Sequence, residues 1–398
     1  MANNNDKKVL NVPALRFPEF SGEWKSKFIN DLASVVSGGT PDTSVKSFWN
    51  GNIQWFTPSE IGKNKYVDSS LRTITEEGLN NSSAKLLPPH TILLSSRATV
   101  GECSLSLKEC ATNQGFQSLI AQSCDTNFLY YLIQTKKKDL IRKACGSTFL
   151  EISANEVRKI QVKIPYDNEQ KKIADFLSLI DERIFTQNKI IEKYESLIQA
   201  ISQKVLRPSE YWNEYRLCEL ADIRSGYSGN QVSHKTAYAV SRIETISKHR
   251  IDMLRVGYVQ DIPSEYKLNV GDILFSNINS IQYIGNTAFV DKEYNLYHGM
   301  NLLRIIPKPS LVIPRFLHLI LCTSMAIKHF QSICNKAVSQ ASINQTSLGK
   351  IMLHIPPLTC QEQICNVFES VEQRLNLEVY YLKRIQLQKN YLLRQMFI

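Results

Sequence analysis

Residues with the types and spacing that catalysis needs are scarce in this chain of 398 residues. Adenine methyl transfer would need an Asn/Asp-Pro-Pro-aromatic motif with a glycine-rich turn, and triphosphate binding would need GxxxxGK[ST]; neither is present. Pro41-Asp42 is a hint of a nuclease core, but no Glu-x-Lys pair follows it nearby, as metal-assisted cleavage would require. The loop from Gly38 to Pro41 could cradle a phosphate, although a tight turn held by the proline is the favoured interpretation. We therefore expect no catalytic residue here.

Cysteine and histidine spacing does not indicate a metal site. The nine cysteines form no CxxC pair, and the seven histidines form no HxxxH or HExxH pattern. Zinc sites in proteins usually draw on such closely spaced pairs. An odd, scattered set of thiols fits a reducing compartment. We expect no metal-binding residue in the chain.

Positive charge is concentrated in two regions. The chain carries a net charge of +10, of which residues 21–165 contribute +4 and residues 207–355 contribute +5. An excess of this kind favours a polyanionic partner over an acidic small substrate. The most apolar run, 311–327, is interrupted by Pro314, Arg315 and His318, and residues 3–8 near the start of the chain are all polar. We therefore expect neither a membrane span nor a cleavable signal peptide. We expect a soluble cytoplasmic protein.

Two stretches carry apolar residues on a strict seven-residue period, which is the a/d seam of a coiled coil. The first seam spans residues 173–205, and the same seam returns 191 residues later over 364–396. So narrow a stripe covers little of a globular core, and each helix is expected to pair with the other. Both follow an Ile-Pro step, at Pro165 and Pro356, which suits the entry to a helix. The alternative is two amphipathic helices packed into separate cores.

The sequence around these helices is also written twice. Trp24, Leu32 and Gly38 reappear 188 residues later as Trp212, Leu220 and Gly226. Strands are predicted at 53–56, 91–94, 116–121 and 160–164 in the first copy and at 273–276, 287–290 and 302–306 in the second, with helices at 127–144 and 314–332. The predicted fold is two copies of a mixed α/β (α+β) domain, separated by two long helices that pair as an antiparallel coiled coil, in a pseudo-two-fold arrangement.

The order of these motifs resembles the specificity subunit of a type I restriction-modification enzyme. The resemblance covers the whole chain and rests on short segments, each weak alone, beside the duplicated helix. They are Pro13–Phe20 running into Gly22–Trp24, Ser37–Pro41, Ile53–Phe56, Ser95–Gly101, Thr112–Phe116, and Lys159–Pro165 followed by Glu169–Ala174. The second copy departs from the pattern at Gly226–Gly229 and at Tyr297–Asn301, so loop positions carried onto it are less secure.

The resemblance implies a division of labour between this chain and its partners. Two target-recognition domains would each read one half of a split double-stranded DNA sequence, with the paired helices setting the spacer. Methyltransferase subunits would dock on the helices and bring S-adenosylmethionine, and a helicase-nuclease restriction subunit with ATP and Mg²⁺ would complete the complex. The chain itself would hold no cofactor. The predicted boundaries are an N-terminal arm 1–20, domains 21–165 and 207–355, and helices 166–206 and 356–398.

Candidate DNA-reading residues lie where the two copies diverge, since identical side chains cannot read two different half-sites. Arginine and lysine suit the guanine edge, and glutamine or asparagine suits adenine, while other cations contact phosphate. The candidates in the first copy are Thr43, Lys46, Lys63, Lys65 and Arg72, and in the second Gln231, His234, Lys235, Arg242, Lys248, His249 and Arg250. Arg97, beside a strand end, is a separate candidate for a contact with the DNA backbone. For each of them a solvated surface position is the alternative.

Three polar residues interrupt the apolar seams. Gln187 and Glu378 occupy the same slot of the repeat and are expected to lie near each other and to set the register of the helices. Lys389 breaks the second seam and is expected to reach solvent or to mark a methyltransferase contact. Two other functions stay open at this point, a stand-alone DNA-modifying enzyme and a coiled-coil DNA scaffold without sequence preference.

Overall fold

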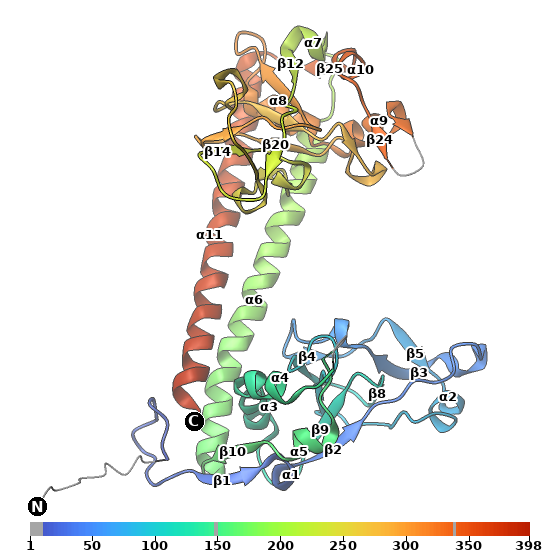
Figure 1. Ribbon diagram of the computed structural model, residues 1–398, viewed down its shortest axis with the longest axis vertical. Helices are drawn as coiled ribbons and strands as arrows, with labels where there is room; N and C mark the ends of the chain where they lie inside the picture. Colours follow the sequence, from blue (N-terminus) through green and yellow to red (C-terminus); the bar gives the residue numbers. More distant parts are fainter. Residues whose placement is uncertain (1–10, 147–149, 337–339) are drawn as a thin grey trace, which may run out of the picture. The chain divides into compact units, whose positions relative to one another are not determined.

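The computed structural model describes residues 11–146, 150–336 and 340–398 (Figure 1). The chain divides into two compact units. Unit 1 comprises Met1–Ile190 and Glu378–Ile398, and unit 2 comprises Ile191–Leu377. The first ten residues of the predicted arm 1–20 lie outside the described residues. The other predicted domain boundaries stay predictions.

Two helices of 39 residues each, α6 (Asp167–Val205) and α11 (Leu358–Met396), contribute one part to each unit. All ten seam positions of each helix are buried or half-buried, and in each unit the two helices run antiparallel (Figure 1). In unit 1, Ile173 and Leu177 of α6 share one core with Leu392 and Met396 of α11. In unit 2, Ile198 and Ile201 share another core with Phe368. The predicted antiparallel coiled coil is confirmed, and its ends also pack into the globular cores.

Unit 1 is built on a five-stranded sheet in the order β2-β9-β6-β7-β4. A three-stranded sheet β5-β3-β8 and a strand pair β1-β10 complete it. The strands are β1 (Lys25–Phe28), β2 (Ala33–Ser37), β3 (Trp49–Phe56), β4 (Tyr66–Val67), β5 (Arg72–Ile74), β6 (Ile92–Leu94), β7 (Cys103–Ser106), β8 (Cys110–Thr112), β9 (Gln117–Ala121) and β10 (Gln161–Ile164).

Unit 2 repeats the main sheet with one strand added and has a further sheet beside it. Its main sheet runs β12-β22-β18-β20-β16-β15, beside sheets β13-β17-β14-β21 and β19-β24-β23 and a pair β11-β25. The strands are β11 (Asn213–Arg216), β12 (Ala221–Ser225), β13 (Gln231–Val232), β14 (Tyr238–Val240), β15 (Ile246–Ser247), β16 (Arg250–Ile251), β17 (Gly257–Val259), β18 (Ile273–Phe275), β19 (Ile278–Asn279), β20 (Thr287–Phe289), β21 (Leu296–Tyr297), β22 (Leu303–Pro307), β23 (Asn335–Lys336), β24 (Ala341–Ser342) and β25 (Met352–Ile355). The predicted mixed α/β domains are confirmed.

The shorter helices correct two predictions. In place of single helices at 127–144 and 314–332, each unit has two, and in unit 2 the side chain of Thr323 caps the second by accepting from the backbone of Ala326. A new N-cap starts a new helix because it satisfies amides that the preceding turn leaves unpaired. The helices are α1 (Ile29–Leu32), α2 (Glu76–Asn80), α3 (Thr126–Thr135), α4 (Lys137–Lys143), α5 (Ala154–Arg158), α7 (Leu217–Leu220), α8 (Pro314–Leu321), α9 (Ser324–Ile333) and α10 (Gln345–Gly349).

Residues that are identical in the two copies serve the scaffold. Leu32 and Leu220 are buried, and a Cβ atom on either Gly38 or Gly226 would lie 1.9 Å from a backbone carbonyl oxygen. At the start of each long helix a buried glutamine accepts from a neighbouring backbone amide and donates to the carbonyl of the entry proline. Those glutamines are Gln170 and Gln361.

Among the described residues, no helix combines the length and the apolar character needed to cross a bilayer.

Candidate nucleic-acid interface

The candidate residues of unit 1 separate into two groups. Arg72, on β5, lies flat on an aromatic platform, with its guanidinium carbon 3.6 Å from the centre of a Trp49 ring and 5.6 Å from a Trp55 ring. The two indoles pack edge to face at 5.1 Å, and Trp49 Nε1 donates to the carbonyl of Asp42 at 3.0 Å. Arg72 is nevertheless exposed. A stacked guanidinium keeps a fixed plane, which suits bidentate recognition of a base edge.

The loop before β3 borders this platform. Thr43 and Lys46 are exposed, and Lys46 begins a short 3₁₀ turn, Lys46–Phe48, that leads directly into Trp49. The structure therefore brings Thr43, Lys46 and Arg72 together on one part of unit 1.

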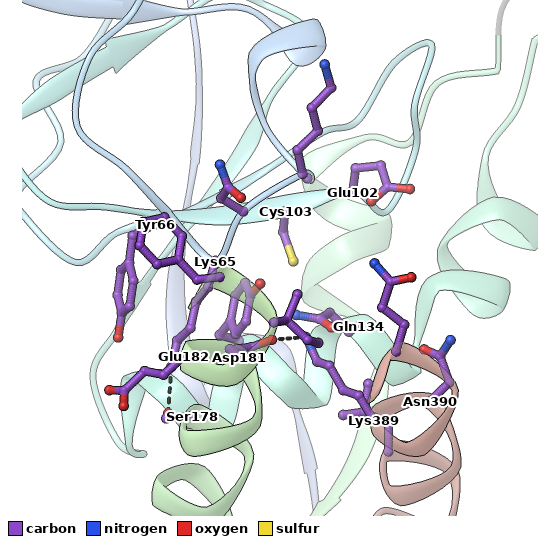
Figure 2. Close-up of a pocket in the computed structure, with 18 of the residues that line it drawn as sticks. Lys65, Tyr66, Glu102, Cys103, Gln134, Ser178, Asp181, Glu182, Lys389 and Asn390 are labelled. Carbon is purple, nitrogen blue, oxygen red and sulfur yellow. Dashed lines mark hydrogen bonds and ion pairs between the residues drawn. The ribbon is translucent and has the colours of Figure 1, made fainter. Parts of the chain in front are cut away.

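Lys63, Lys65 and Arg97 lie elsewhere in unit 1. Lys63 and Arg97 are exposed, and Arg97 Nη2 is paired with Glu151 at 2.6 Å. Lys65 differs from the other candidates because it is 8% exposed and points to α6, not to solvent. Its ammonium donates to Ser178 Oγ at 2.7 Å (Figure 2). It also donates to the hydroxyl of Tyr131 at 3.2 Å. The alternative of a solvated surface position is therefore wrong for Lys65, since the loop that carries it packs against the helix.

A cavity of 1030 Å³ surrounds this lysine within unit 1. Asp181 is paired with Lys389 at 2.7 Å (Figure 2). Asp181 also accepts from the Tyr131 hydroxyl at 2.6 Å. Burial lowers the pKa of Lys65 to about 8, against the opposing charge of Asp181, and burial also raises the pKa of Tyr131. Lys389 is 14% exposed, so the expectation that it reaches solvent from the seam is wrong; its partner lies across the helix pair.

In unit 2 the first group of candidates lies around β17. A Cβ atom on Gly257 would approach Gln231 Oε1 to 2.5 Å and Arg242 Cδ to 3.0 Å, so these two side chains flank the same strand position. Both are exposed, as are His234 and Lys235 in the connection between β13 and β14. An amide and a guanidinium side by side match the donor and acceptor pattern of base edges.

The second group forms the turn between β15 and β16. Lys248 and His249 have φ values of 48° and 61°, as the two-residue hairpin turns with positive φ require. Arg250 Nη1 donates to Asn376 Oδ1 on α11 at 2.9 Å, and His249 Nδ1 lies 3.3 Å from Cys322 Sγ. Lys248, His249 and Arg250 are exposed, but two of the three also contact helices of their own unit.

The two seam residues meet as expected. Gln187 Nε2 lies 2.5 Å from Glu378 Oε2 and 3.1 Å from the Glu378 carbonyl, and Glu378 is 5% exposed. Their part in setting the register stays a prediction.

Sequence reasoning missed the aromatic platform and the neighbours of His249. Trp49 and Trp55 lie six residues apart, so alternation along a strand could have placed them on one face with Arg72 opposite. His318 and Cys322 lie four residues apart in the predicted helix 314–332, which could have placed them on one face, but no signal in the sequence brings the distant His249 to them.

Comparisons with known proteins were made against both sequences and structures. The profile of the type I restriction modification DNA specificity domain matches residues 21–196 and 209–386. The type I restriction enzyme MjaIX specificity subunit of Methanocaldococcus jannaschii is 36% identical over 179 residues, which are 43% of this chain and 41% of that protein. The chain thus spans less than half the length of the first curated relatives that it matches, at 41% and 43%.

Solved structures give a match over the full length. A type I restriction-modification S subunit from M. genitalium aligns with a TM-score of 0.58 and 16% identity, covering 97% of this chain and 99% of that one. A structure described as the basis of complex assembly and conformational transition of the type I R-M system aligns with a TM-score of 0.59 and 15% identity over 93% and 96%. At such identities the likeness shows the fold. Because the profile matches two stretches that make up most of its length, the chain belongs to the type I restriction-modification DNA specificity family.

Proposed function

We propose that this chain is the DNA-recognition subunit of a type I restriction-modification complex and reads a split DNA sequence, one part with each unit. The observation that carries the proposal is the pairing of a repeated scaffold with unlike surfaces. Both units have the same strand order in the main sheet, from β2 to β4 and from β12 to β16, yet their exposed polar residues differ. Two copies of one fold that carry different exposed polar residues suit the recognition of two different half-sites.

Each unit offers residues that can contact base edges and residues that can contact phosphate. In unit 1, the stacked Arg72 would read a guanine edge, and Lys46 and Lys63 would contact phosphate. In unit 2, Gln231 would read adenine beside Arg242, with His234 and Lys235 near the backbone. Arg97 and Lys248 are further backbone candidates, and Thr43 would reach either a base or a phosphate.

The partner subunits would supply the chemistry. Methyltransferase subunits would bring S-adenosylmethionine and flip a target adenine out of each half-site, and a restriction subunit would bring ATP and Mg²⁺. The long helices offer a place for docking, since several large apolar side chains in their unit 1 portion are exposed. These are Leu179, Phe185, Tyr380 and Tyr391, at 64%, 52%, 55% and 60%. The complex would act on DNA in the cytoplasm.

Mapping of methylated adenines tests the proposal. The chain is expressed with its methyltransferase partner in a host without other adenine methylation, and all methylated sites are sequenced. We expect a split sequence with a gap of fixed length and one methylated adenine in each part. A contiguous site, or unchanged methylation when this chain is left out, would contradict the proposal.

A second experiment separates the alternatives. The purified chain alone, incubated with labelled S-adenosylmethionine and DNA, should transfer no methyl group, whereas a stand-alone enzyme would. Selection of bound sequences from a random pool should return a split consensus. A scaffold without sequence preference would return none.

A further inference from the structure

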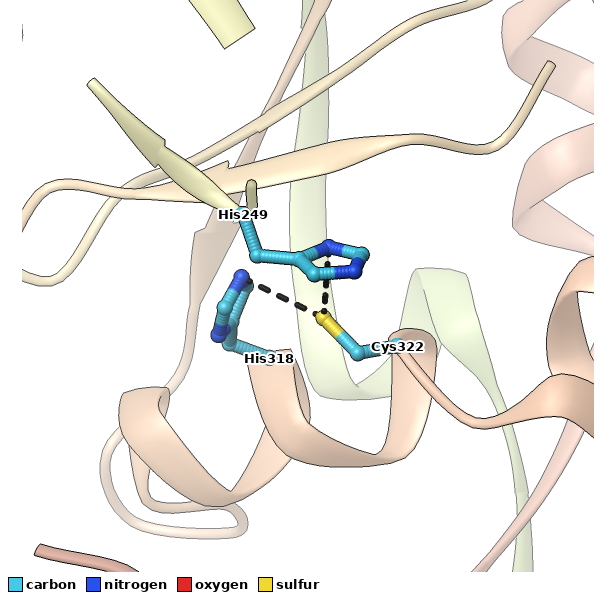
Figure 3. Close-up of side chains that lie close together, drawn as sticks. All are labelled: His249, His318 and Cys322. Carbon is cyan, nitrogen blue, oxygen red and sulfur yellow. Dashed lines mark hydrogen bonds between the residues drawn. The ribbon is translucent and has the colours of Figure 1, made fainter. Parts of the chain in front are cut away.

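Unit 2 contains a cluster of three metal-ligating side chains, of which His249 is also one of the candidate DNA-reading residues. His318 and Cys322 lie one helical turn apart at the end of α8, and His249 reaches them from the turn between β15 and β16 (Figure 3). Cys322 Sγ lies 3.3 Å from His249 Nδ1 and 3.4 Å from His318 Nε2. All three ligand atoms lie within 4.8 Å of one another.

The two sulfur–nitrogen distances match an edge of a tetrahedral site. With Zn–N bonds of about 2.0 Å and a Zn–S bond of about 2.3 Å, neighbouring nitrogen and sulfur ligands stand about 3.5 Å apart. Two imidazoles and one thiolate are a donor set of borderline softness, which suits zinc over calcium or magnesium. The fourth position would be left to water or to a further ligand.

The surroundings hold the ligands as metal sites commonly do. The ring of His249 is hydrogen-bonded to the backbone of Thr287, and Thr287 Oγ1 lies 3.2 Å from Cys322 Sγ. Contacts of this kind orient an imidazole and stabilise a thiolate.

The backbone at His249 adds an independent observation. Lys248 and His249 both have left-handed φ angles, a pair of positions that two-residue hairpin turns normally fill with Asn-Gly. Non-glycine residues in that region cost of the order of 1 kcal/mol each and persist where the surroundings require them. A turn of this type directs the side chain of His249 onto α8 (Figure 3).

We propose that His249, His318 and Cys322 bind a divalent cation of the zinc class, which fastens the β15–β16 turn to α8. On binding, the Cys322 thiol releases its proton to solvent and forms the metal–sulfur bond. His318 binds through Nε2 and carries its single proton on Nδ1. Arg315 Nη1, which lies 2.8 Å from His318 Nδ1, must turn away while Arg315 Nη2 stays on Glu372 at 2.5 Å. Arg315 and the cation therefore compete for His318.

Cobalt substitution tests the site in the full chain. The protein is freed of metal with a chelator under reducing conditions and titrated with Co²⁺ and then with Zn²⁺. We expect one equivalent of Co²⁺ to give a thiolate-to-cobalt charge-transfer band with tetrahedral d–d bands, and Zn²⁺ to displace it. Cys322→Ser should abolish the charge-transfer band, and His318→Ala should weaken binding by about 100-fold or more.

Two matched variants separate ligand loss from misfolding. His249→Gly removes a ligand but relieves the strained turn, so it should lose the cobalt bands without losing thermal stability. Lys248→Gly relieves the same strain and keeps the ligand, so it should keep them. Cys218→Ser, which removes an exposed thiol of the same unit, should bind as the parent does. Arg315→Gln should bind Zn²⁺ more tightly, because it removes the competing cation.

Three results would overturn the inference. One is an absence of cobalt bands in the parent chain, a second is a charge-transfer band that survives Cys322→Ser, and the third is equal binding by His249→Gly and Lys248→Gly. None of them bears on split-site recognition, since each is measured on the chain without DNA.

Discussion

The same place in the two units holds different chemistry. In unit 1, Tyr66 of β4 pairs with Leu105 of β7. In unit 2, Arg250 of β16 pairs with Phe289 of β20, and both of these residues lie 184 positions after their counterparts in unit 1. The preceding residues are therefore equivalent, Lys65 in unit 1 and His249 in unit 2. Lys65 sits in a network of hydroxyl and charged groups, whereas His249 faces an imidazole and a thiol.

This comparison shows which contacts the scaffold keeps and which it leaves free to change. Asp181 and Glu372 occupy one position of the helix repeat, and both tie a helix to the domain beside it, through Tyr131 and Arg315 respectively. The acidic character is retained, while the partners differ. Residues that act through the backbone, such as Gln170 and Gln361, are identical in residue and in contact. At these matched positions the difference lies in contacts between side chains.

The largest effect should come from the glycines that both units share. In Gly38→Ala or Gly226→Ala, the added Cβ would meet a carbonyl oxygen at 1.9 Å, so each variant should lower the free energy of unfolding by about 4 kcal/mol. Urea unfolding measures this loss. Gly22→Ala is the control: its φ is +84° with nothing within 4 Å, and it should cost about 1 kcal/mol. If only one of the two variants were strongly destabilised, the two glycines would not have equivalent roles in the two units.

The acidic anchors should differ in strength. Asp181→Asn leaves Lys389 and Lys65 as buried charges, whereas Glu372→Gln leaves the half-buried Arg315 near solvent. We expect losses of about 4 kcal/mol for the first and about 1 kcal/mol for the second. Thermal unfolding of the two variants side by side checks the order, and equal losses would show that burial does not separate the anchors.

Lys65 should give unit 1 a distinct pH dependence. Its pKa is about 8 in the folded chain against an ordinary 10.5, so between these values the unfolded chain holds more protons and stability rises with pH. This contribution amounts to at most about 3 kcal/mol. Lys65→Met should lack the rise, and Lys63→Met, at an exposed neighbour, should retain it. The free energy of unfolding is measured at pH 7 and at pH 10 for the parent and both variants. If it rose as much in Lys65→Met as in the parent, a buried ammonium at this position would be excluded.

The smallest effect should come from the seam. Replacing Gln187 and Glu378 together by leucine should stabilise the chain by about 1 kcal/mol, since two apolar residues fit the seam at least as well as a polar pair. Gln187→Leu alone should destabilise, because it removes a donor from a carboxylate that is 5% exposed. A sharp loss of thermal stability in the double variant would show that the polar pair does not lower the stability of the coiled coil.

The long helices and the repeat could be predicted because their signals are periodic. Ten seam positions in register are visible without any structure, and the matched segments around Gly38 and Gly226 place the two sheets. The break between α8 and α9 was missed although Thr323 is a typical N-cap residue, since the apolar pattern continues through it.

The environments of single polar residues could not be predicted. Lys65 looks like a loop cation in the sequence, and its burial depends on Ser178, which lies 113 residues later. The cluster of His249 with His318 and Cys322 depends in the same way on a contact between distant segments. Local spacing carries no information about such contacts.

Selection of DNA sequences by variants of single units tests most directly whether each unit reads its own part of the site. The chain, in complex with its methyltransferase partner, is assayed as the parent, as Arg72→Ala and as Arg242→Ala. We expect Arg72→Ala to relax base preference on one side of the gap and Arg242→Ala to relax it on the other side. If both variants relaxed the same bases, or if the selected sites had no gap, recognition by two separate units would be contradicted.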